Sequence, residues 1–240
     1  MNSRKKKVVI VVPVFNEEGS LKSLINKLEK INLGEKYDND LLFINDGSTD
    51  SSKQILLDSK VNFISHSSNL GLSATTQTGY KFSYLNNYDY MVKVDGDGQH
   101  PPDQIFKLLE AAENSDEDMI IGSRFIEKTN YTQAFYRKIG ISYASLLLRI
   151  STGLNIKDTT SGFLVIKSNL LKFFSQCLDY PQKSGGLIFL LIAWKAGYTF
   201  REVSIPHLER KTGTSSINIL NGLIFPARTL INLIAVLMRK

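Results

Sequence analysis

The chain has very few of the residues that cross-link a small fold or hold a structural metal. It is 240 residues long and contains one cysteine, Cys177, and three histidines, His66, His100 and His207. One cysteine cannot form an internal disulfide, and it is too few for a cysteine-rich zinc site. The histidines lie far apart in the sequence and show no metal-ligand spacing. The composition fits a reducing compartment, so we expect a cytoplasmic protein.

Long uninterrupted apolar runs are also missing. Val8 to Val14 is too short for the apolar region of a secretory signal and leads directly into strand-like sequence. The best candidate for a membrane span, residues 217–238, is interrupted by Pro226, Arg228 and asparagines, whereas an inserted helix needs about 20 mainly apolar residues. The chain has neither a G-x-G-x-x-G after its first strand nor a Walker-type G-x-x-x-x-G-K-[ST]. The common dinucleotide and triphosphate sites are therefore not expected.

Positive charge is what the sequence has in excess. The formal net charge is +6 and the sequence pI about 9.2, while 42% hydrophobic and 22% charged residues are ordinary for a folded protein. A basic balance suits polyanionic partners: nucleic acid, anionic lipid or phosphorylated small molecules. Because no nucleic-acid-binding motif is visible and the basic residues are not interleaved with aromatic ones, we expect no nucleic-acid partner. The basic run at residues 4–7 could also serve solubility alone.

Short apolar strands alternate with helical patterns through the first half of the chain. Strands are expected at 8–12, 41–44, 61–65, 90–94 and 119–121, and helices at 17–31, 49–57, 72–85 and 102–112. This alternation is typical of an α/β fold with a mostly parallel sheet and crossover helices on both faces. The second half is less regular, with helices expected at 133–150 and 185–196 and extended segments at 163–166 and 198–205. We expect one continuous domain, residues 1–216, and a helical appendage, residues 217–240.

The appendage has an amphipathic pattern. Its polar residues fall mainly on one helical stripe and its apolar residues on the other side, and Pro226 is expected to kink it or split it into two helices. Such an element can lie in a membrane interface with its apolar face down, and the flanking basic residues favour this interpretation. The alternative is a helix packed on the protein's own core or on a partner subunit, which leaves a homo-oligomer open.

Polar clusters follow three of the expected strands, at residues 13–17, 45–50 and 95–100. Each could be ordinary turn chemistry, and Asp50 could simply cap the next helix. In open parallel sheets, however, ligands bind beyond the carboxyl ends of the strands, where all three clusters would meet. Asp95-Gly96-Asp97 places two carboxylates on either side of a glycine that permits a bend. Such a pair can hold Mg²⁺ or Mn²⁺, which prefer oxygen ligands and leave positions for substrate phosphates.

Taken together, these stretches resemble glycosyltransferase family 2, which has a GT-A fold, and most closely its dolichol-phosphate mannose synthase-like branch. The resemblance follows the order of the chain over nearly its whole length. The matching stretches are Val11 to Glu18 (VVPVFNEE), Ile44 to Asp50 (INDGSTD), Asn69 to Gly71 (NLG), Val94 to Pro102 (VDGDGQHPP), Gly122 to Arg124 (GSR), Asp158 to Phe163 (DTTSGF) and Glu209 to Ser215 (ERKTGTS).

The resemblance also implies roles for single residues. The nucleotide pocket is implied at Pro13, Phe15 and Glu17, with Asp46 against the base or ribose, and the metal and diphosphate site at Asp95, Asp97 and Gln99. His100 is expected to be a structural neighbour of that site. The basic residues implied at the donor or acceptor phosphates are Arg124, Arg137 and, closing over the donor, Arg210. Arg137 also begins an amphipathic helix and could be structural.

The implied reaction is inverting transfer of a sugar from a UDP- or GDP-sugar to a polyprenyl or dolichyl phosphate. Asp158 is ambiguous, because a carboxylate in this region is the general base in relatives that use a hydroxyl acceptor. Transfer to a hydroxyl of a lipid-linked or surface glycan therefore stays as the alternative. A nucleotidyltransferase and a membrane-docked scaffold are more distant ones.

The end of the chain departs from part of this branch. Some relatives carry two transmembrane helices after the late motif, whereas this sequence has one interrupted apolar segment there and resembles the peripheral or a truncated integral form. We expect a peripheral enzyme at the cytoplasmic face of a membrane.

Overall fold

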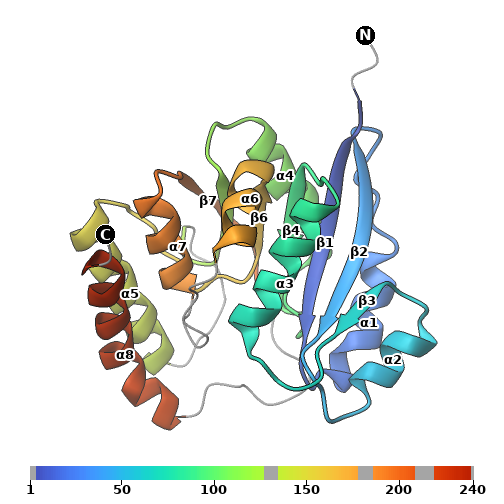
Figure 1. Ribbon diagram of the computed structural model, residues 1–240, viewed down its shortest axis with the longest axis horizontal. Coiled ribbons are helices and arrows are strands. Elements are labelled where there is room, and N and C mark those ends of the chain that lie inside the picture. The colour runs from blue at the N-terminus through green and yellow to red at the C-terminus, as the bar shows by residue number, and fades with distance from the viewer. Residues whose placement is uncertain (1–3, 127–134, 178–185, 209–218, 239–240) are drawn as a thin grey trace.

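The computed structural model describes residues 4–126, 135–177, 186–208 and 219–238, without the side chains of 135–138, 219–226 and 228. These residues form a seven-stranded sheet in the order β3-β2-β1-β4-β6-β5-β7 (Figure 1). Its strands are β1 (Lys6–Val14), β2 (Tyr37–Asn45), β3 (Phe63–Ser65), β4 (Tyr90–Lys93), β5 (Met119–Ser123), β6 (Leu164–Lys167) and β7 (Phe200–Ser204). Only β6 runs against its neighbours in this described sheet, antiparallel to both β4 and β5. The expected mostly parallel α/β sheet is confirmed.

The central strands are buried on both faces, which is why they read as continuous apolar runs. From Val8 to Val14, every residue of β1 is buried. Val9 and Val11 point into one hydrophobic core, while Val8, Ile10 and Val12 point into the other. The alternation of side chains along a strand thus supplies both sides of the sheet.

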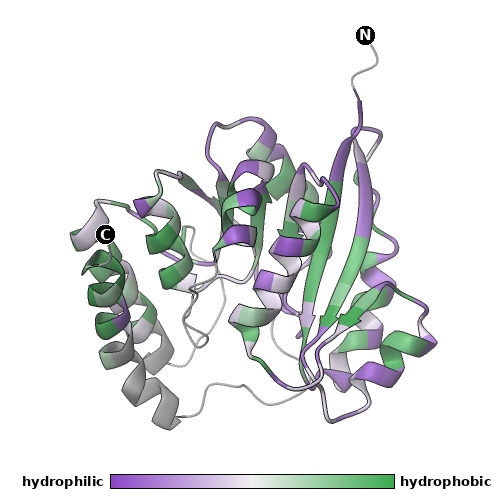
Figure 2. Ribbon diagram, viewed as in Figure 1, coloured by the Kyte–Doolittle hydropathy of each residue, from purple (hydrophilic) through white to green (hydrophobic). Residues whose placement is uncertain are grey.

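Helices cover both faces. One core is completed by α1 (Glu18–Leu28), α2 (Ser52–Asp58) and α4 (Ile105–Glu113), the last preceded by a 3₁₀ turn at Pro102–Gln104. The other is completed by α3 (Leu72–Leu85), α5 (Phe135–Thr152), α6 (Ser168–Gln176), α7 (Gly186–Lys195) and α8 (Ile219–Met238). Figure 2 shows hydrophobic residues concentrated along the central strands and the inward sides of these helices.

Two elements differ from the sequence-based expectations. The helix α6 was not predicted, although Leu170, Leu171 and Phe174 have helical spacing, because it is only nine residues long and follows β6 directly. Of the two effects expected of Pro226, the split into two helices is wrong, since α8 is one helix from Ile219 to Met238, while the kink stays a prediction. A proline costs one backbone hydrogen bond, and the packing of α8 on α5 and α7 offsets that loss.

The helix α8 packs against the rest of the protein along one side and accepts a hydrogen bond near its carboxyl end. Thr229, Leu233 and Val236 are buried, and α8 packs against both α5 and α7. Lys195 of α7 donates from Nζ to the carbonyl oxygen of Val236 at 2.9 Å. A lysine at the carboxyl end of a helix satisfies a carbonyl that has no partner within the helix and complements the helix dipole.

The reversed strand β6 determines which loops meet. Lys93 of β4 lies opposite Leu164 of β6 in an antiparallel register. The segment that enters β6 therefore lies beside the residues that leave β4. Residues 158–163 and residues 95–100 consequently share one edge of the sheet.

Candidate functional site

The loops after β1 and β2 are joined side chain to backbone. Asn16, with φ 55°, occupies the left-handed region that asparagine tolerates better than most residues. Its backbone N–H donates to Ser48 Oγ at 3.1 Å, and its side-chain Oδ1 accepts the N–H of Thr49 at 2.8 Å. The first two of the three polar clusters thus form one surface at the carboxyl ends of β1 and β2.

Hydrogen bonds join the start of α1 to the start of α2, the two helices that follow these loops. The N–H of Glu17 donates to Ser52 Oγ at 2.9 Å, and the N–H of Glu18 donates to Asp50 Oδ2 at 3.1 Å. Asp50 Oδ1 accepts the N–H of Ser52 at 2.9 Å. Asp50 therefore contacts the start of α2, in agreement with the expectation that it could cap this helix. Burial opposes ionisation of Asp50, but the hydrogen bonds from Ser52 and Glu18 outweigh it and lower the pKa of the carboxyl.

The third cluster packs directly onto the first. A Cβ atom at Gly96 would lie 2.7 Å from the carbonyl oxygen of Pro13, so only glycine allows this approach. Ser20 Oγ, at the start of α1, donates to the carbonyl oxygen of Gly96 at 2.9 Å. The bend between Asp95 and Asp97 is therefore held against the loop after β1. We call the surface formed by residues 13–17, 45–50 and 95–100 the donor edge.

The residues expected in the nucleotide pocket differ in exposure. Pro13 is buried, Glu17 is half-buried, and the aromatic ring of Phe15 is 41% exposed. An exposed ring beside polar loops can stack on a nucleobase.

Asp46 is 3% exposed and is surrounded by protein donors. Its Oδ1 lies 2.7 Å from His66 Nδ1 and accepts the N–H of Leu70 at 3.0 Å, and its Oδ2 accepts the N–H of Gly71 at 2.8 Å. His66 Nε2 lies 3.0 Å from Thr78 Oγ1 on α3. The structure thus places Asp46 as the organiser of the loop that leads into α3. Its expected contact with the base or ribose stays a prediction.

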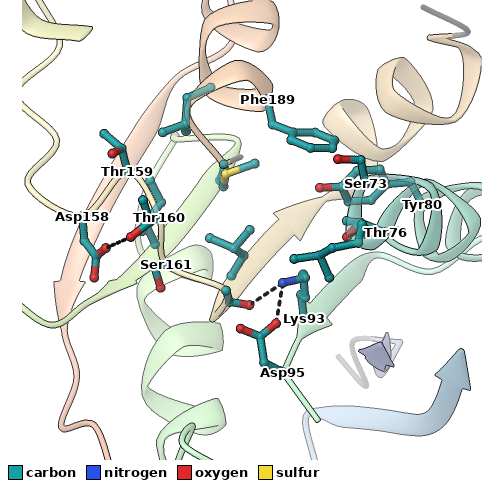
Figure 3. A pocket seen from close by; sticks show the side chains of 17 residues that line it. Ser73, Thr76, Tyr80, Lys93, Asp95, Asp158, Thr159, Thr160, Ser161 and Phe189 are labelled. Carbon is teal, nitrogen blue, oxygen red and sulfur yellow. Dashed lines mark hydrogen bonds and ion pairs between the residues drawn. The ribbon is translucent and has the colours of Figure 1, made fainter. Parts of the chain in front are cut away.

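Asp95 is paired with a lysine of the strand that precedes it. Its Oδ1 accepts a hydrogen bond from Lys93 Nζ at 2.6 Å, and Lys93 Nζ also donates to the carbonyl oxygen of Gly162 at 3.3 Å (Figure 3). Burial raises the pKa of Asp95, but the ammonium of Lys93 reverses this and holds the pKa well below its usual range. The carboxylate is ionised at neutral pH, and its side chain is 32% exposed.

His100, at the end of the same loop, contacts both the backbone and the side chain of Asp95, with its Nε2 3.9 Å from Asp95 Oδ2. Its Nδ1 accepts the backbone N–H of Asp95 at 3.0 Å, and its ring stacks on Phe163 with centroids 4.9 Å apart. Burial lowers the pKa of His100 to about 4 and that of the neighbouring His207 to about 3. Both rings are neutral near pH 7. His100 is only 4% exposed, which fits the expected structural role.

The remaining expected metal ligands, Asp97 and Gln99, are half-buried. Asp97 Oδ1 accepts the N–H of Gln99 at 3.1 Å. The carbonyl oxygen of Gln99 accepts the N–H of Leu208 at 2.9 Å, and its Nε2 donates to the carbonyl oxygen of Leu208 at 3.3 Å. These two bonds tie the donor edge to the segment after β7. Arg210, expected to close over the donor, lies outside the described residues.

Arg124 and Asp158 form a buried ion pair, in which the Asp158 side chain is 0% and the Arg124 side chain 13% exposed. Arg124 donates from Nε to Asp158 Oδ2 at 2.7 Å and from Nη2 to Oδ1 at 2.6 Å, and its backbone N–H donates to Oδ2 at 3.1 Å. Nη2 also donates to Thr160 Oγ1 at 2.8 Å. Both carboxylate oxygens of Asp158 are thus held by one guanidinium in a bidentate pair. The side chain of Arg137 lies outside the described residues.

A small cavity of about 100 Å³ lies behind Asp95, between α3, α7 and the sheet (Figure 3). Its polar lining includes Ser73, Thr76, Lys93 and Thr159, and its apolar lining includes Ile121. The Thr159 hydroxyl is buried and has no hydrogen-bond partner within the described part of the chain. A cavity of this size with several polar groups can hold ordered water or a small polar group of a ligand.

The oxygen donors at the donor edge fit a hard divalent cation that is shared with a substrate. Asp95, Asp97 and Gln99 offer the carboxylate and amide oxygens that Mg²⁺ and Mn²⁺ prefer. The described residues contain no group of three or more His, Cys, Asp or Glu side chains that could hold a metal ion on its own. The arrangement therefore fits a cation that takes its remaining ligands from a bound phosphate group.

Two site residues were missed in the sequence. Lys93 carries a signal that could have revealed it, since it is the only charged residue in the apolar run 90–94 and lies two residues from Asp95, on the same face of the strand. Glu202 of β7 accepts the backbone N–H groups of Lys157 and Asp158, each at 2.8 Å, and so positions the ion pair. No local pattern connects Glu202 with a segment so distant in the sequence.

Comparison with known proteins adds the family. A family model described as Glycosyl transferase family 2 matches residues 9–174. The chain is 28% identical over 218 residues to the UDP-N-acetylglucosamine–dolichyl-phosphate N-acetylglucosaminyltransferase of Methanococcus voltae, covering 83% of this chain and 85% of that protein. It is 27% identical over 227 residues to the undecaprenyl-phosphate mannosyltransferase of Micrococcus luteus, covering 88% of each. With the dolichol-phosphate mannosyltransferase of Pyrococcus furiosus it shares 32% identity over 173 residues, which is 69% of this chain and 47% of that protein.

Solved structures agree on the fold. Glucosyl-3-phosphoglycerate synthase from Mycobacterium tuberculosis, in complex with phosphoglyceric acid, superimposes with a TM-score of 0.71 at 16% identity, covering 96% of this chain and 80% of that one. The same protein in complex with Mn²⁺, uridine diphosphate and glucosyl-3-phosphoglycerate gives a TM-score of 0.70 at 16% identity. At this level of identity the likeness shows the fold, and the expected GT-A architecture is confirmed.

Proposed function

Because the chain belongs to glycosyl transferase family 2, we propose that it transfers a sugar from a nucleoside diphosphate sugar to the phosphate of a polyprenyl or dolichyl phosphate, with inversion at the anomeric carbon. The names of the three relatives include dolichyl-phosphate, undecaprenyl-phosphate and dolichol-phosphate, respectively. Their matches extend over 69% to 88% of this chain, which supports the same class of acceptor here.

The observation that carries the choice of acceptor is the state of Asp158. Both of its oxygens accept hydrogen bonds from Arg124, and its side chain is fully buried. A carboxylate held this way is a poor general base, because taking up a proton would break a buried ion pair. A phosphate monoester needs no base, since it is already anionic near neutral pH. The geometry therefore supports a phosphate acceptor over a hydroxyl acceptor.

In the proposed reaction the donor edge binds the nucleotide and the diphosphate. Phe15 stacks on the base, and Asp97 and Gln99, with one oxygen of Asp95, hold the divalent cation. When bound, such a cation offsets the negative charge that develops on the departing diphosphate.

In the proposed reaction one bond forms, between the acceptor and the sugar, and one bond breaks, between the sugar and the diphosphate. A phosphate oxygen of the acceptor attacks the anomeric carbon from the face opposite the diphosphate, so the new C–O bond forms as the bond to the diphosphate breaks. No proton has to be removed. The protein contributes position and electrostatic complementarity, with Arg137 and Arg210 proposed at the phosphates.

The site of action is proposed to be the cytoplasmic face of a membrane. No helix in the described ranges is long and apolar enough to cross a bilayer. The helices α5 and α8 lie side by side (Figure 1) and expose large apolar side chains: Ile139, Leu146, Ile150, Leu230, Ile231, Ile234, Leu237 and Met238. Neither 135–152 nor 219–238 contains an acidic residue, so this apolar face suits an anionic lipid surface.

The test of the proposed function is transfer of a radiolabelled sugar. The purified protein would be given UDP- and GDP-sugars with Mn²⁺ or Mg²⁺ and either a polyprenyl phosphate or the corresponding polyprenol. Labelled product with the phosphate and none with the alcohol is expected, with release of nucleoside diphosphate. Transfer to the alcohol alone would support the hydroxyl-acceptor alternative, and release of pyrophosphate would reveal a nucleotidyltransferase.

The acceptor can be checked from the protein side with Asp158→Asn. If Asp158 only holds Arg124, Asp158→Asn changes the rate through the position of Arg124 and leaves the acidic limb of the pH profile of kcat as it is in the unaltered protein. If Asp158 were the base, the variant would lose nearly all turnover at every pH.

A further inference from the structure

Lys93 is a charged residue in an otherwise apolar part of the sheet. Along β4, Met91 points into the core beneath α3 and α7, Tyr90 and Val92 point into the other core, and Lys93 follows on the side of Met91. It is 4% exposed and shares its cavity with Met119, Ile121 and Leu164. An ammonium group in such surroundings costs free energy unless it is paired.

The partner of Lys93 is a residue of the donor edge. Its Nζ donates to Asp95 Oδ1 at 2.6 Å and to the carbonyl oxygen of Gly162 at 3.3 Å (Figure 3). A Cβ atom at Gly162 would collide with the Asp95 carboxylate, so Gly162 leaves room for this pairing. One oxygen of Asp95 is therefore occupied by a cation that belongs to the protein.

This pairing changes the charge that a metal ion meets. Asp95 and Asp97 together carry two negative charges, and Lys93 cancels one of them. Within the described residues no third carboxylate or histidine completes a metal site. From Asp95, Asp97 and Lys93 taken together, a divalent cation alone gains the attraction of one net negative charge and few ligands, whereas a nucleoside diphosphate brings further negative charge and oxygen ligands.

We propose that Lys93 is a positioning residue that acts as the built-in counter-ion of Asp95, so that the donor edge takes up its divalent cation only together with the nucleoside diphosphate. The inference rests on the proposed function, since it concerns the same donor site. It adds the order in which the ligands bind and the residue that sets this order. It also limits Asp95 to one oxygen, Oδ2, for the cation.

The test measures binding of Mn²⁺ to the full chain from the loss of the free Mn²⁺ signal in electron paramagnetic resonance. Titrations are run with Mn²⁺ alone and with UDP or GDP. The unaltered protein is expected to bind Mn²⁺ weakly alone and more tightly with one of the nucleotides. In Lys93→Met, removal of a positive charge beside Asp95 is expected to tighten binding of Mn²⁺ alone by about tenfold, since a neighbouring opposite charge changes such equilibria by roughly 1–3 log units.

Further variants separate charge from shape. Lys93→Gln removes the charge but keeps a hydrogen-bond donor, and it should behave as Lys93→Met. Lys93→Arg keeps the charge and should bind Mn²⁺ as the unaltered protein does. Lys27→Met, at an exposed position in the last turn of α1, makes the same change in net charge at the end of the helix away from the donor edge and should have no effect. Combining Lys93→Met with Asp95→Asn should abolish the gain, because the freed carboxylate is then absent.

Turnover gives an independent readout. In Lys93→Met, kcat should fall because Asp95 loses its fixed position, while the Mn²⁺ concentration at half-maximal rate also falls. A purely structural role would instead weaken metal binding and turnover together. Circular dichroism and thermal unfolding confirm that each variant is folded before it is titrated.

The outcomes are distinguishable. If folded Lys93→Met and Lys93→Gln bind Mn²⁺ alone no more tightly than the unaltered protein, the counter-ion role is overturned while the proposed function stands. If the unaltered protein binds neither nucleotide with Mn²⁺, the proposed function itself fails.

Discussion

The donor edge and the paired helices α5 and α8 differ in how far their side chains are already in contact with other parts of the protein. At the donor edge nearly every polar group has a protein partner: Asn16 holds Ser48 and Thr49, and Lys93 holds Asp95. Along α5 and α8, apolar side chains that a folded protein would usually bury are uncovered, with Ile150 74% and Ile231 65% exposed.

The difference indicates what each region still needs. A surface whose polar groups already support one another is organised before its ligand arrives, so that binding does not have to order it. An exposed apolar surface with no acidic residues, in contrast, lowers its free energy only when something apolar covers it. The molecule thus has a preorganised polar edge, where we propose that the donor binds, and an exposed apolar surface on α5 and α8, where we propose that a lipid surface docks.

The largest loss of activity is expected from a substitution at the donor edge that leaves the fold intact. Asp97→Asn removes a charge from the proposed cation site, and we expect transfer to fall by on the order of 10²–10³ because the departing diphosphate loses stabilisation. Asp116→Asn, at an exposed position after α4, makes the same chemical change and serves as the control. The measurement is single-turnover transfer of labelled sugar. Near-normal rates in Asp97→Asn would contradict the proposed role of this edge.

The ion pair beneath the edge should matter most for stability. Asp158→Asn leaves the buried guanidinium of Arg124 without its counter-charge, and we expect a loss of roughly 3–5 kcal/mol in the free energy of unfolding. Exposed Asp103→Asn should change it by less than about 0.5 kcal/mol. Urea titration followed by circular dichroism compares the two. Equal midpoints would mean that the pair does not organise the fold.

The helical surface should respond to charge by losing membrane affinity rather than stability. Burying one isoleucine is worth about 1.5–3 kcal/mol, so Ile231→Glu should reduce binding to anionic liposomes by on the order of tenfold. Leu85→Glu, on α3 and similarly exposed at 63%, is the matched control and should float as the unaltered protein does. If both variants floated equally well, the α5–α8 face would not be the docking surface.

A pH dependence of stability is also expected, from His100 of the donor edge and the neighbouring His207. Burial depresses the pKa of His100 to about 4 and of His207 to about 3, whereas both would titrate near 6.5 in the unfolded chain. As pH falls from 6.5 toward 5, the unfolded chain takes up protons that the folded chain does not, so the free energy of unfolding decreases.

This decrease should be on the order of 1 kcal/mol per pH unit for each histidine. His207→Phe should reduce the slope by about half. Below about pH 4 the low pKa of Asp95 adds a further loss, because its ionised form stabilises the folded state. Urea midpoints that stay constant between pH 6.5 and 5 would show that the two rings are not buried neutral.

Features of the fold and the site can be predicted from the sequence where the pattern that indicates them lies within a few neighbouring residues. The strands that end in Asn45-Asp46 and Asp95-Gly96-Asp97 combine a buried apolar run with turn residues, and both signals lie within a dozen residues. The four-residue run of β6 shows an extended segment but contains nothing that determines its direction. The reversal of β6, which brings Gly162 to Asp95, therefore could not be predicted.

Pairings between distant residues were the other limit. The sequence marks both Arg124 and Asp158 as candidates, but separately: Arg124 as a phosphate contact, and Asp158 as an ambiguous residue that is a base only for a hydroxyl acceptor. The structure brings them together as one ion pair, positioned by Glu202 from a third segment. The pairing of Lys93 with Asp95 could have been predicted, because their spacing of two residues along one strand places both side chains on the same face.

The reversed strand also has a consequence for how the chain reaches its folded state. In the described sheet β5 touches β6 and β7 but not β4, so it cannot join the strands made before it until β6 has been synthesised and inserted between them. A nascent chain that has passed residue 123 but not residue 167 therefore carries Met119-Ile120-Ile121 as an unpaired apolar strand. Such strands are prone to pair with other chains. We expect translation stalled in this interval to yield the species of this protein that aggregates most readily.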